Sequence, residues 1–151
     1  MAIFKPQGFF LGLLLCLPLM TQGQGLGGLV AQSDTFLPVE EAYQLEVEVV
    51  SEQEIRLYWQ IEDAYYLYQH RFKAKLQDEQ GVIDTTFEFS PALDKNDEFF
   101  GDVSVYYSYA DIRLLAETGF SEARLSITSQ GCADAGLCYP PHTEHFIVNG
   151  Q

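Results

Sequence analysis

Residues 43–61 read YQLEVEVVSEQEIRLYWQI, and this stretch decides the fold class. Apolar and polar side chains alternate through residues 43–49 and again through residues 55–61, which is the period of a β-strand with one buried face. The short polar segment between the two runs has the composition of a turn, so we expect a β-hairpin. Trp59 belongs to the second run and is expected in the core.

Further strand-like runs, separated by turn signals, follow along the rest of the chain. They cover residues 65–68, 70–76, 82–89, 103–109, 112–115, 123–128 and 143–148. Residues 62–64 and 78–81 have the composition of turns, and Ser90-Pro91 ends the run before it. No sustained helical period occurs before Val148, although residues 111–118 would fit one helical turn.

The number of these runs predicts an all-β fold, an immunoglobulin-like antiparallel β-sandwich. The antibody-domain signature is absent, because Trp59 precedes Cys132 and Cys138, and these two cysteines lie too close in sequence to join two sheets. The chain has 151 residues, of which 47% are apolar and 14% aromatic, and this suits one domain with a substantial core. The cysteines therefore need another explanation.

The first 31 residues have the features of a secretory signal peptide. Lys5 lies in a short N-terminal region, residues 9–20 form an apolar run too short to span a bilayer comfortably, and small and polar residues follow. Cleavage after Ala31 or after Gly23 would fit this pattern. We therefore expect an exported domain over residues 32–151 that is not inserted in the membrane.

The same segment determines the cysteine count and the charge of the exported domain. Cys16 would leave with the signal peptide, and lipidation at Cys16 is disfavoured because Leu15 stands where a small residue is usual. Two cysteines then remain, in an oxidising compartment. Loss of Lys5 leaves seven basic and 22 acidic residues, a net charge of −15. Phosphate backbones and anionic lipid surfaces would repel such a domain, which excludes nucleic acid as a partner.

The two remaining cysteines, Cys132 and Cys138, lie in the segment QGCADAGLCYPP at residues 130–141. Its glycines and prolines exclude a strand interior and a helix, so we expect an ordered turn that brings the two sulfurs together. A disulfide closing a loop of about seven residues would stabilise the fold by about 2.3 kcal/mol, against about 4.7 kcal/mol for a loop of about 100 residues. The pair is either a weak structural staple or a working dithiol, and the residues alone leave both open.

A second notable segment is DEFFG at residues 97–101. Asp97 and Glu98 precede two aromatic residues, Phe99 and Phe100, and Gly101 ends the segment. Two adjacent aromatic side chains in a polar loop are unusual, because they are not expected to be both buried and both freely exposed. Composition alone is equally compatible with core packing and with a binding role.

Three motifs together resemble the N-terminal periplasmic domain of the thiol:disulfide interchange protein DsbD. They are WQIEDAYYLY at residues 59–68, DEFFG at residues 97–101 and QGCADAGLCYPP at residues 130–141. The resemblance covers roughly residues 36–148. It implies an immunoglobulin-like domain, without a cofactor, that receives electrons from a thioredoxin-like domain. The implied acceptors are periplasmic oxidoreductases, namely the disulfide isomerase DsbC and the cytochrome c maturation thioredoxin.

The resemblance also implies roles for single residues. Cys132 and Cys138 would be the redox pair, with Cys138 forming the mixed disulfide with a partner and Cys132 resolving it. Phe99 would be the centre of a cap loop, residues 97–101, that shields the disulfide and moves away for a partner. Phe100 stands where this family usually has a tyrosine, so no hydrogen bond from that hydroxyl is expected here.

Other residues of the motifs are candidates for supporting the site. Three tyrosines are expected either to pack in the sandwich or to lie beside the sulfurs: Tyr66, Tyr68 and Tyr139. Asp134, together with Asp97 and Glu98, would disfavour a thiolate, and the sequence around the cysteines shows no neighbouring Lys or Arg and no helix N-terminus. We therefore expect a pair that reacts slowly alone and is activated by a docked partner.

Two other classes of protein remain compatible with the residues. One is a metal-binding module for Zn²⁺ or copper that would use two thiols and two imidazoles: Cys132, Cys138, His142 and His145. Their spacing departs from the usual zinc patterns, and Pro140-Pro141 would constrain the loop. The other class is an immunoglobulin-like binding domain with an inert disulfide.

Overall fold

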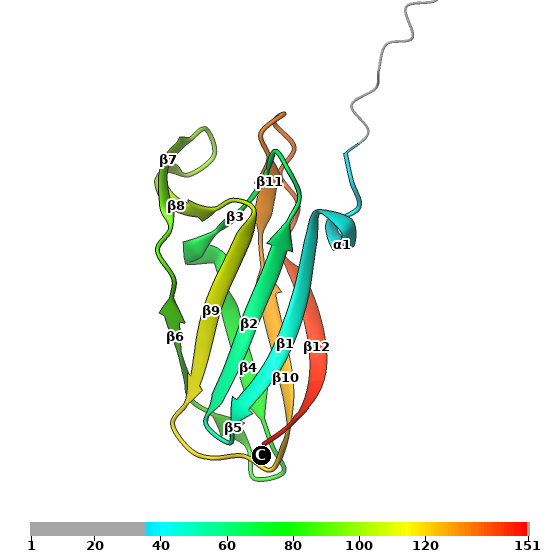
Figure 1. The fold of residues 1–151 in the computed structure, drawn as a ribbon, viewed down its shortest axis with the longest axis vertical. Helices are drawn as coiled ribbons and strands as arrows, with labels where there is room; N and C mark the ends of the chain where they lie inside the picture. The colour runs from blue at the N-terminus through cyan, green and yellow to red at the C-terminus, as the bar shows by residue number, and fades with distance from the viewer. Residues whose placement is uncertain (1–35, 151) are drawn as a thin grey trace, which may run out of the picture. The chain divides into compact units, whose positions relative to one another are not determined.

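The alternating runs fold into an all-β antiparallel sandwich, shown in Figure 1 as a computed structural model. The structure describes residues 36–150. The expected signal peptide, its two candidate cleavage sites and Cys16 lie outside the described residues. The prediction of an all-β, immunoglobulin-like antiparallel β-sandwich is confirmed.

Within residues 36–150 the chain forms twelve strands and two short helical turns. The strands are β1 (Tyr43–Ser51), β2 (Glu54–Ile61), β3 (Tyr65–Tyr68), β4 (Lys73–Gln77), β5 (Val82–Ile83), β6 (Thr85–Phe89), β7 (Leu93–Asp97), β8 (Gly101–Tyr106), β9 (Tyr109–Ala116), β10 (Glu122–Ser129), β11 (Gly131–Ala133) and β12 (His142–Asn149). The helical turns are α1 (Val39–Ala42), before β1, and the 3₁₀ turn η1 (Gln69–Arg71), after β3.

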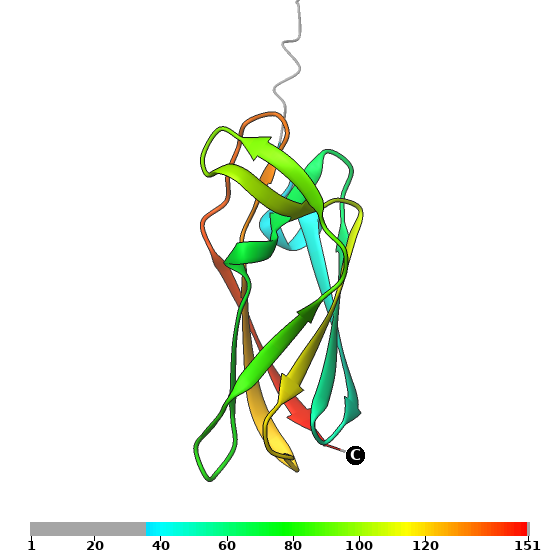
Figure 2. The same ribbon diagram turned by 90° about the vertical axis from the view of Figure 1, so that its left-hand side faces the viewer.

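Two four-stranded sheets form the layers of the sandwich, and Figure 2 shows them side on. One sheet has the order β1-β2-β9-β6 and the other the order β12-β10-β4-β5. Alternation along β2 buries Ile55, Leu57 and Trp59, while Leu125 and Ile127 of β10 are buried in the other layer. Each large apolar side chain buried in this way stabilises the fold by about 1.5–3 kcal/mol.

The hairpin expected over residues 43–61 is present. Strands β1 and β2 pair with Tyr43 opposite Ile61 and Val49 opposite Ile55, and the register shifts between Val49 and Ser51 next to the turn. Trp59 is fully buried, as predicted, and its ring centroid lies 4.8 Å from that of Phe72.

Two runs that were expected to be single strands are each two strands. Residues 82–89 divide at Asp84, because β5 pairs with β4 in one layer and β6 pairs with β9 in the other. Residues 103–109 divide near Ser108, whose φ of +61° turns the chain from β8 into β9. Within residues 82–89 the alternation of side chains continues across Asp84, where the chain changes its pairing partner, so the pattern does not reveal that break.

Two further predictions are wrong in their details, and one strand was not predicted. Residues 111–118 form no helical turn, because most of them belong to β9, which pairs with β2 and β6. The run at residues 70–76 becomes a strand only at Lys73, since η1 precedes it. Strand β7 was not expected, because the polar sequence of residues 93–97 lacks an apolar alternation and pairs only with β8.

A third sheet, in the order β11-β3-β8-β7, lies at one end of the sandwich and positions the cysteines. Strand β3 pairs with β11 on one side and with β8 on the other, and all four of its residues are buried. As for membrane insertion, none of the helices among residues 36–150 has the length and apolar character needed to cross a bilayer.

Candidate functional site

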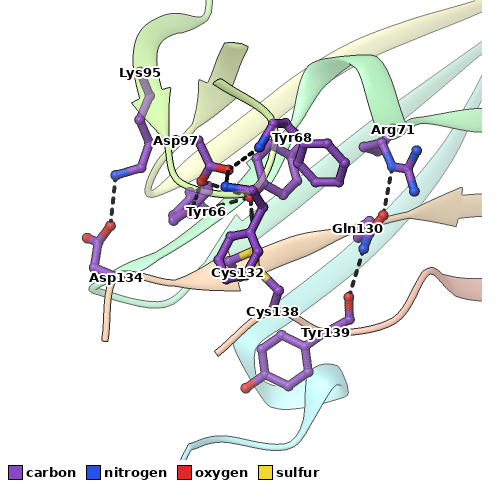
Figure 3. The surroundings of a disulfide bond; sticks show 12 residues. Tyr66, Tyr68, Arg71, Lys95, Asp97, Gln130, Cys132, Asp134, Cys138 and Tyr139 are labelled. Carbon is purple, nitrogen blue, oxygen red and sulfur yellow. Dashed lines mark hydrogen bonds and ion pairs between the residues drawn. A yellow bond between two sulfur atoms is a disulfide. The ribbon is translucent and has the colours of Figure 1, made fainter. Parts of the chain in front are cut away.

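The two cysteines lie at the base of a tight turn, residues 132–138, that begins in β11. Pairing of β11 with β3 places Cys132 opposite Tyr66, and the chain then turns so that Cys138 forms an isolated antiparallel bridge with Cys132. Inside the turn, the backbone N–H of Ala133 donates to the carbonyl oxygen of Leu137 at 2.7 Å. A disulfide joins the two sulfurs (Figure 3), so the sequence prediction that they approach each other is confirmed.

Two glycines are required by the shape of this turn. At Gly131, a Cβ atom would collide with the carbonyl oxygen of Tyr66 and with the hydroxyl of Tyr43. At Gly136, φ is +94°, a left-handed conformation that residues with a Cβ rarely adopt. The glycines of the sequence motif thus allow the close approach of β11 to β3 and the reversal of the chain.

The two sulfurs differ in how accessible they are. Cys132 is fully buried, whereas Cys138 is partly exposed. Cys132 belongs to a small cluster of buried side chains, separate from the main core, that we call the end cluster: Tyr66, Tyr68, Val105 and Cys132, with Val103, Tyr107 and Cys138 packed against it. A partner molecule would therefore reach Cys138 first.

The hydroxyl of Tyr68 connects the sulfurs to a buried carboxylate. It lies 3.0 Å from Sγ of Cys132 and 3.8 Å from Sγ of Cys138, and it donates a hydrogen bond to Oδ2 of Asp97 at 2.9 Å. The Tyr66 hydroxyl donates to the same oxygen at 2.6 Å. Figure 3 shows Tyr66 and Tyr68 beside the disulfide. Of the two positions expected for these tyrosines, packed in the sandwich or beside the sulfurs, the structure shows the second.

The electrostatic state of this group follows from its hydrogen bonds. Burial of Asp97 raises the pKa of its carboxyl, but hydrogen bonds from the hydroxyls of Tyr66 and Tyr68 and from the backbone N–H groups of Phe99 and Phe100 outweigh burial and hold that pKa below its ordinary value. Burial, opposed in part by the hydrogen bond with Tyr66, raises the pKa of the Tyr68 hydroxyl to about 12. At neutral pH, an ionised carboxylate thus lies one hydroxyl away from the disulfide.

Asp97 also shapes the turn at residues 97–101, the expected cap loop. Its Oδ1 accepts hydrogen bonds from the backbone N–H groups of Phe99 at 2.9 Å and Phe100 at 3.0 Å. Gly101 closes the turn with φ of +74°. Glu98 is exposed, and its Oε1 lies 3.9 Å from the position that a Cβ on Gly136 would take, so the loop reaches over the cysteine turn.

The two phenylalanines of this loop have different surroundings. Phe99 is 51% exposed and Phe100 is 41% exposed. The Phe100 ring meets the Tyr68 ring edge to face, with centroids 5.0 Å apart, and the guanidinium of Arg71 lies 5.2 Å from the Phe100 centroid. Phe100 therefore covers Tyr68, a contact that the sequence did not reveal.

A cluster around Lys95 was also missed from the sequence. Lys95 lies on β7, and its Nζ donates to the hydroxyl of Tyr107 at 2.9 Å and to Oδ1 of Asp134 at 3.2 Å. The same ammonium lies 4.6 Å from the centroid of the Tyr66 ring. The sequence around the cysteines shows no neighbouring Lys or Arg, but pairing of β7 with β8 brings Lys95 to the end cluster from 37 positions before Cys132.

Tyr139 is placed differently from the other candidate tyrosines. Its hydroxyl donates to the carbonyl oxygen of Leu37 at 2.6 Å, and its ring meets the Tyr43 ring edge to face at 5.7 Å. Its own carbonyl oxygen accepts a hydrogen bond from Gln130 at 3.0 Å. Tyr139 thus anchors the C-terminal end of the cysteine turn to the main core.

The four residues considered as metal ligands are distributed over different parts of the fold. Cys132 and Cys138 form the disulfide, and His145 lies on the outer face of β12, where its Nδ1 is 2.8 Å from Oγ of Ser126. Over residues 36–150, no group of three or more His, Cys, Asp or Glu side chains has the arrangement of a metal site.

Comparison with known protein families and curated proteins identifies relatives of the chain. A family model described as "Thiol:disulfide interchange protein DsbD, N-terminal" matches residues 33–150. The thiol:disulfide interchange protein DsbD 1 of Pseudomonas aeruginosa is 36% identical over 129 residues, which cover 85% of this chain and 22% of the relative. DsbD of Pseudomonas sp. (strain JR1 / K1) is 42% identical over 119 residues, which cover 76% of this chain and 19% of the relative. The chain therefore spans about a fifth of the length of these relatives.

Solved structures with the same fold come from Neisseria meningitidis. The N-terminal domain of its DsbD in the reduced form is 32% identical, with a TM-score of 0.69, and the match covers 76% of this chain and 90% of that one. A structure of the complex between the DsbD N-terminal and PilB N-terminal domains gives 31% identity and a TM-score of 0.65, over 78% of this chain and 91% of that one.

Proposed function

The chain belongs to the family of DsbD N-terminal domains, and from this premise we propose that residues 32–151 form an exported domain for thiol-disulfide exchange. The proposed activity is the reduction of protein disulfides by the Cys132 and Cys138 pair. One observation supports this proposal above the others: the disulfide lies in a polar, hydrogen-bonded cluster with one sulfur buried and the other accessible. A structural staple does not need that arrangement.

The exchange would take place in two steps. In the reduced domain, the thiolate of Cys138 attacks one sulfur of the partner's disulfide, so that a bond forms between Sγ of Cys138 and that sulfur while the partner's other sulfur leaves as a thiolate. Cys132 then loses its proton and attacks Sγ of Cys138, which releases the partner's remaining sulfur as a thiolate. After protonation, the partner has gained two electrons and two protons, and the domain is oxidised.

The hydrogen bonds of Tyr68 support this order of attack. Tyr68 has one hydroxyl proton, which it donates to Asp97. Its oxygen can therefore accept the S–H of the buried Cys132 in the reduced domain, which favours the neutral thiol of that residue. Cys138 is left as the sulfur that a partner reaches and as the attacking group, and Cys132 serves as the resolving thiol.

The charges near the sulfurs support a pair that reacts slowly until a partner docks. Asp97 is ionised, and Asp134 lies two positions after Cys132 in the sequence. Glu98 extends over the cysteine turn. Each of these carboxylates disfavours a thiolate. Measuring the alkylation rate of the reduced domain against pH tests the proposal, and a thiol pKa well below about 7 would contradict it.

The loop at residues 97–101 would act as a cap over the pair. A dithiol open to an oxidising compartment loses its electrons to unintended acceptors, so an apolar lid enforces the choice of partner. Phe99 would be the shield that moves away for a partner. The loop also contacts the site through Phe100, whose ring packs on that of Tyr68.

The proposed partners are proteins of the bacterial periplasm. The donor would be a thioredoxin-like domain, and the acceptors would be oxidoreductases of the DsbC type and of cytochrome c maturation. The complex formed by the N-terminal domain of Neisseria meningitidis DsbD with a PilB N-terminal domain supports a protein as the partner of this chain as well. A strongly acidic domain is also consistent with a protein partner rather than nucleic acid.

Trapping of the mixed disulfide tests the function directly. Reduced Cys132→Ser protein, mixed with an oxidised thioredoxin-like oxidoreductase, should accumulate a covalent complex that mass spectrometry detects and dithiothreitol dissolves. Cys138→Ser protein should give none, and the protein with both cysteines replaced is the control. If neither single variant forms the complex, the disulfide is a structural staple. A complex from Cys138→Ser alone would reverse the two roles.

A further inference from the structure

Three residues in or next to the loops that hold the disulfide carry carboxylates, and a thiolate would add another negative charge. Asp97 is buried next to Tyr68, Asp134 follows the buried cysteine in the turn, and Glu98 extends over the same turn. For exchange to occur at a useful rate, a positive charge must offset part of the negative charge of these carboxylates, so that a thiolate can form. Lys95 supplies a positive charge next to Asp134.

The position of Lys95 is defined by groups from three different elements. Its Nζ is bound by the Tyr107 hydroxyl after β8 and by the Asp134 carboxylate after β11, and it lies over the face of the Tyr66 ring on β3. The Tyr107 hydroxyl in turn donates to Oδ1 of Asp134 at 2.7 Å. Figure 3 shows Asp134 turned toward Lys95 and away from the two sulfurs.

The influence of Lys95 extends from this cluster to the sulfurs. The Tyr66 ring carries the ammonium on its face and the Asp97 carboxylate at its hydroxyl, and Tyr68 links that carboxylate to Cys132. The charge of Lys95 opposes the rise that burial causes in the pKa of the Tyr68 hydroxyl. The same field acts on both sulfurs, because Sγ of Cys132 lies 3.0 Å and Sγ of Cys138 lies 3.8 Å from that hydroxyl.

The contribution of Lys95 to the stability of the fold is expected to be small. The side chains of Lys95 and Asp134 are 29% and 42% exposed. Ion pairs with this exposure typically contribute about 0–1 kcal/mol to folding. The main consequence of this arrangement is therefore its effect on the charge of neighbouring groups.

We propose that Lys95 is a positioning residue for thiol-disulfide exchange, which holds Asp134 away from the sulfurs and balances its charge so that a thiolate can form on the pair. Lys95 touches neither sulfur in this arrangement and acts through Asp134 and the Tyr66 ring. The inference rests on the proposed function, since a thiolate matters only if the pair exchanges.

Four variants separate the effect of charge from an effect on the fold: Lys95→Met, Asp134→Asn, the double variant and Lys73→Met. Each protein is reduced, and its alkylation by iodoacetamide, a neutral reagent, is followed against pH. Below the thiol pKa, Lys95→Met should react about fivefold more slowly than wild type, the size expected of one charge acting across a side chain in a half-buried site. Asp134→Asn should react faster by a similar factor.

The double variant decides the question. Removal of both charges should return the rate to within about twofold of wild type, because the two effects oppose each other. Lys73→Met, which removes an exposed lysine from β4, should leave the pH profile unchanged. A double variant as slow as Lys95→Met would overturn the inference, and so would equal rates for Lys95→Met and Lys73→Met.

Failure of the proposed function would be seen separately. The wild-type disulfide is equilibrated in glutathione redox buffers, and a bond that never opens there refutes the exchange function. The alkylation profiles use chemically reduced protein, so they report on Lys95 in either case.

Lys95→Arg is a further control in the alkylation experiment. It retains the positive charge and should remain close to wild type. A loss in Lys95→Arg equal to that in Lys95→Met would show that charge is not the cause.

Discussion

The main core and the end cluster are both buried, but they differ in chemistry. The main core fills the space between the two layers with apolar side chains such as Leu57 and Leu125. Within residues 36–150, the buried side-chain polar atom without a hydrogen-bond partner is Nε1 of Trp59, in this core. In the end cluster, the buried hydroxyls of Tyr66 and Tyr68 are hydrogen-bonded to one carboxylate.

This difference indicates a division of labour within one domain. The main core supplies the free energy that keeps the sandwich folded, because it buries the larger apolar area. The end cluster has four fully or nearly fully buried members and uses its polar contacts to place a charge near two sulfurs. Substitutions in the main core should therefore change stability, and substitutions in the end cluster should change the reactivity of the thiols.

The largest effect on stability is expected in the main core. Leu57 is fully buried on β2. Leu57→Ala should lower the free energy of unfolding by about 2–5 kcal/mol, because the substitution leaves a cavity. Chemical denaturation of the oxidised protein measures this loss. The thiol alkylation profile of the folded variant should match that of wild type, and a shifted profile would show that the two regions are not separable.

Gly131 lies on the border between the two regions, so its substitution should affect both. A Cβ there would collide with the Tyr66 carbonyl oxygen and with the Tyr43 hydroxyl. Gly131→Ala should cost about 1–3 kcal/mol of stability through overpacking, and it should also change the alkylation rate. Gly119→Ala is the control, because its Cβ would meet only the flexible side chain of Glu52 at 3.1 Å. Equal stability of the two variants would argue against close packing of β11 on β3.

The buried carboxylate of Asp97, which is hydrogen-bonded to the end cluster, should have a smaller effect on stability and a clear effect on the thiols. Asp97→Asn removes the buried carboxylate, so the thiolate should form more easily and alkylation near neutral pH should be faster. Asp94→Asn, on the same strand but exposed, is the matched control. An unchanged rate in Asp97→Asn would mean that the carboxylate does not act on the sulfurs.

The same variant tests the pKa of Asp97 through acid stability. The folded-state pKa of this carboxyl lies below its ordinary value of 3.8. The stability it contributes is thus present above that value and is lost as the pH falls through the folded-state pKa. Wild type should lose stability in this acidic range more steeply than Asp97→Asn, as measured by thermal unfolding against pH. Parallel curves for the two proteins would contradict the lowered pKa.

The smallest effect on the fold, and a specific effect on access, is expected in the cap loop. Phe99 is 51% exposed, so Phe99→Ala should leave the melting temperature nearly unchanged. Exchange of the pair with glutathione should become faster, because the shield is removed. Leu93→Ala removes another exposed apolar side chain, from β7, and should not alter exchange. Unchanged glutathione reactivity of Phe99→Ala would refute the cap role.

The main core could be predicted from the sequence to a large extent, because its signal is local. Alternation over residues 43–61 correctly indicates the β1 and β2 hairpin and the buried position of Trp59. Alternation says nothing about which strand pairs with which. The division at Asp84, where the chain passes from one layer to the other, was therefore missed.

The end cluster was only partly predictable, because tertiary contacts assemble it. The glycines and prolines of the segment at residues 130–141 indicate the turn that joins the two cysteines. Tyr68 and Asp97 are 29 positions apart, and Lys95 and Asp134 are 39 positions apart. Strand β7, which carries Lys95, has no apolar alternation and could not be recognised before its pairing with β8 was known.

The reduction potential of the Cys132 and Cys138 pair tests the central claim most directly. The wild-type domain is equilibrated in redox buffers of graded potential, and its free thiols are counted after quenching and alkylation. An exchange domain should open and close its disulfide reversibly at potentials above about −300 mV. A disulfide that remains closed well below about −300 mV would identify the pair as a structural staple and contradict the account.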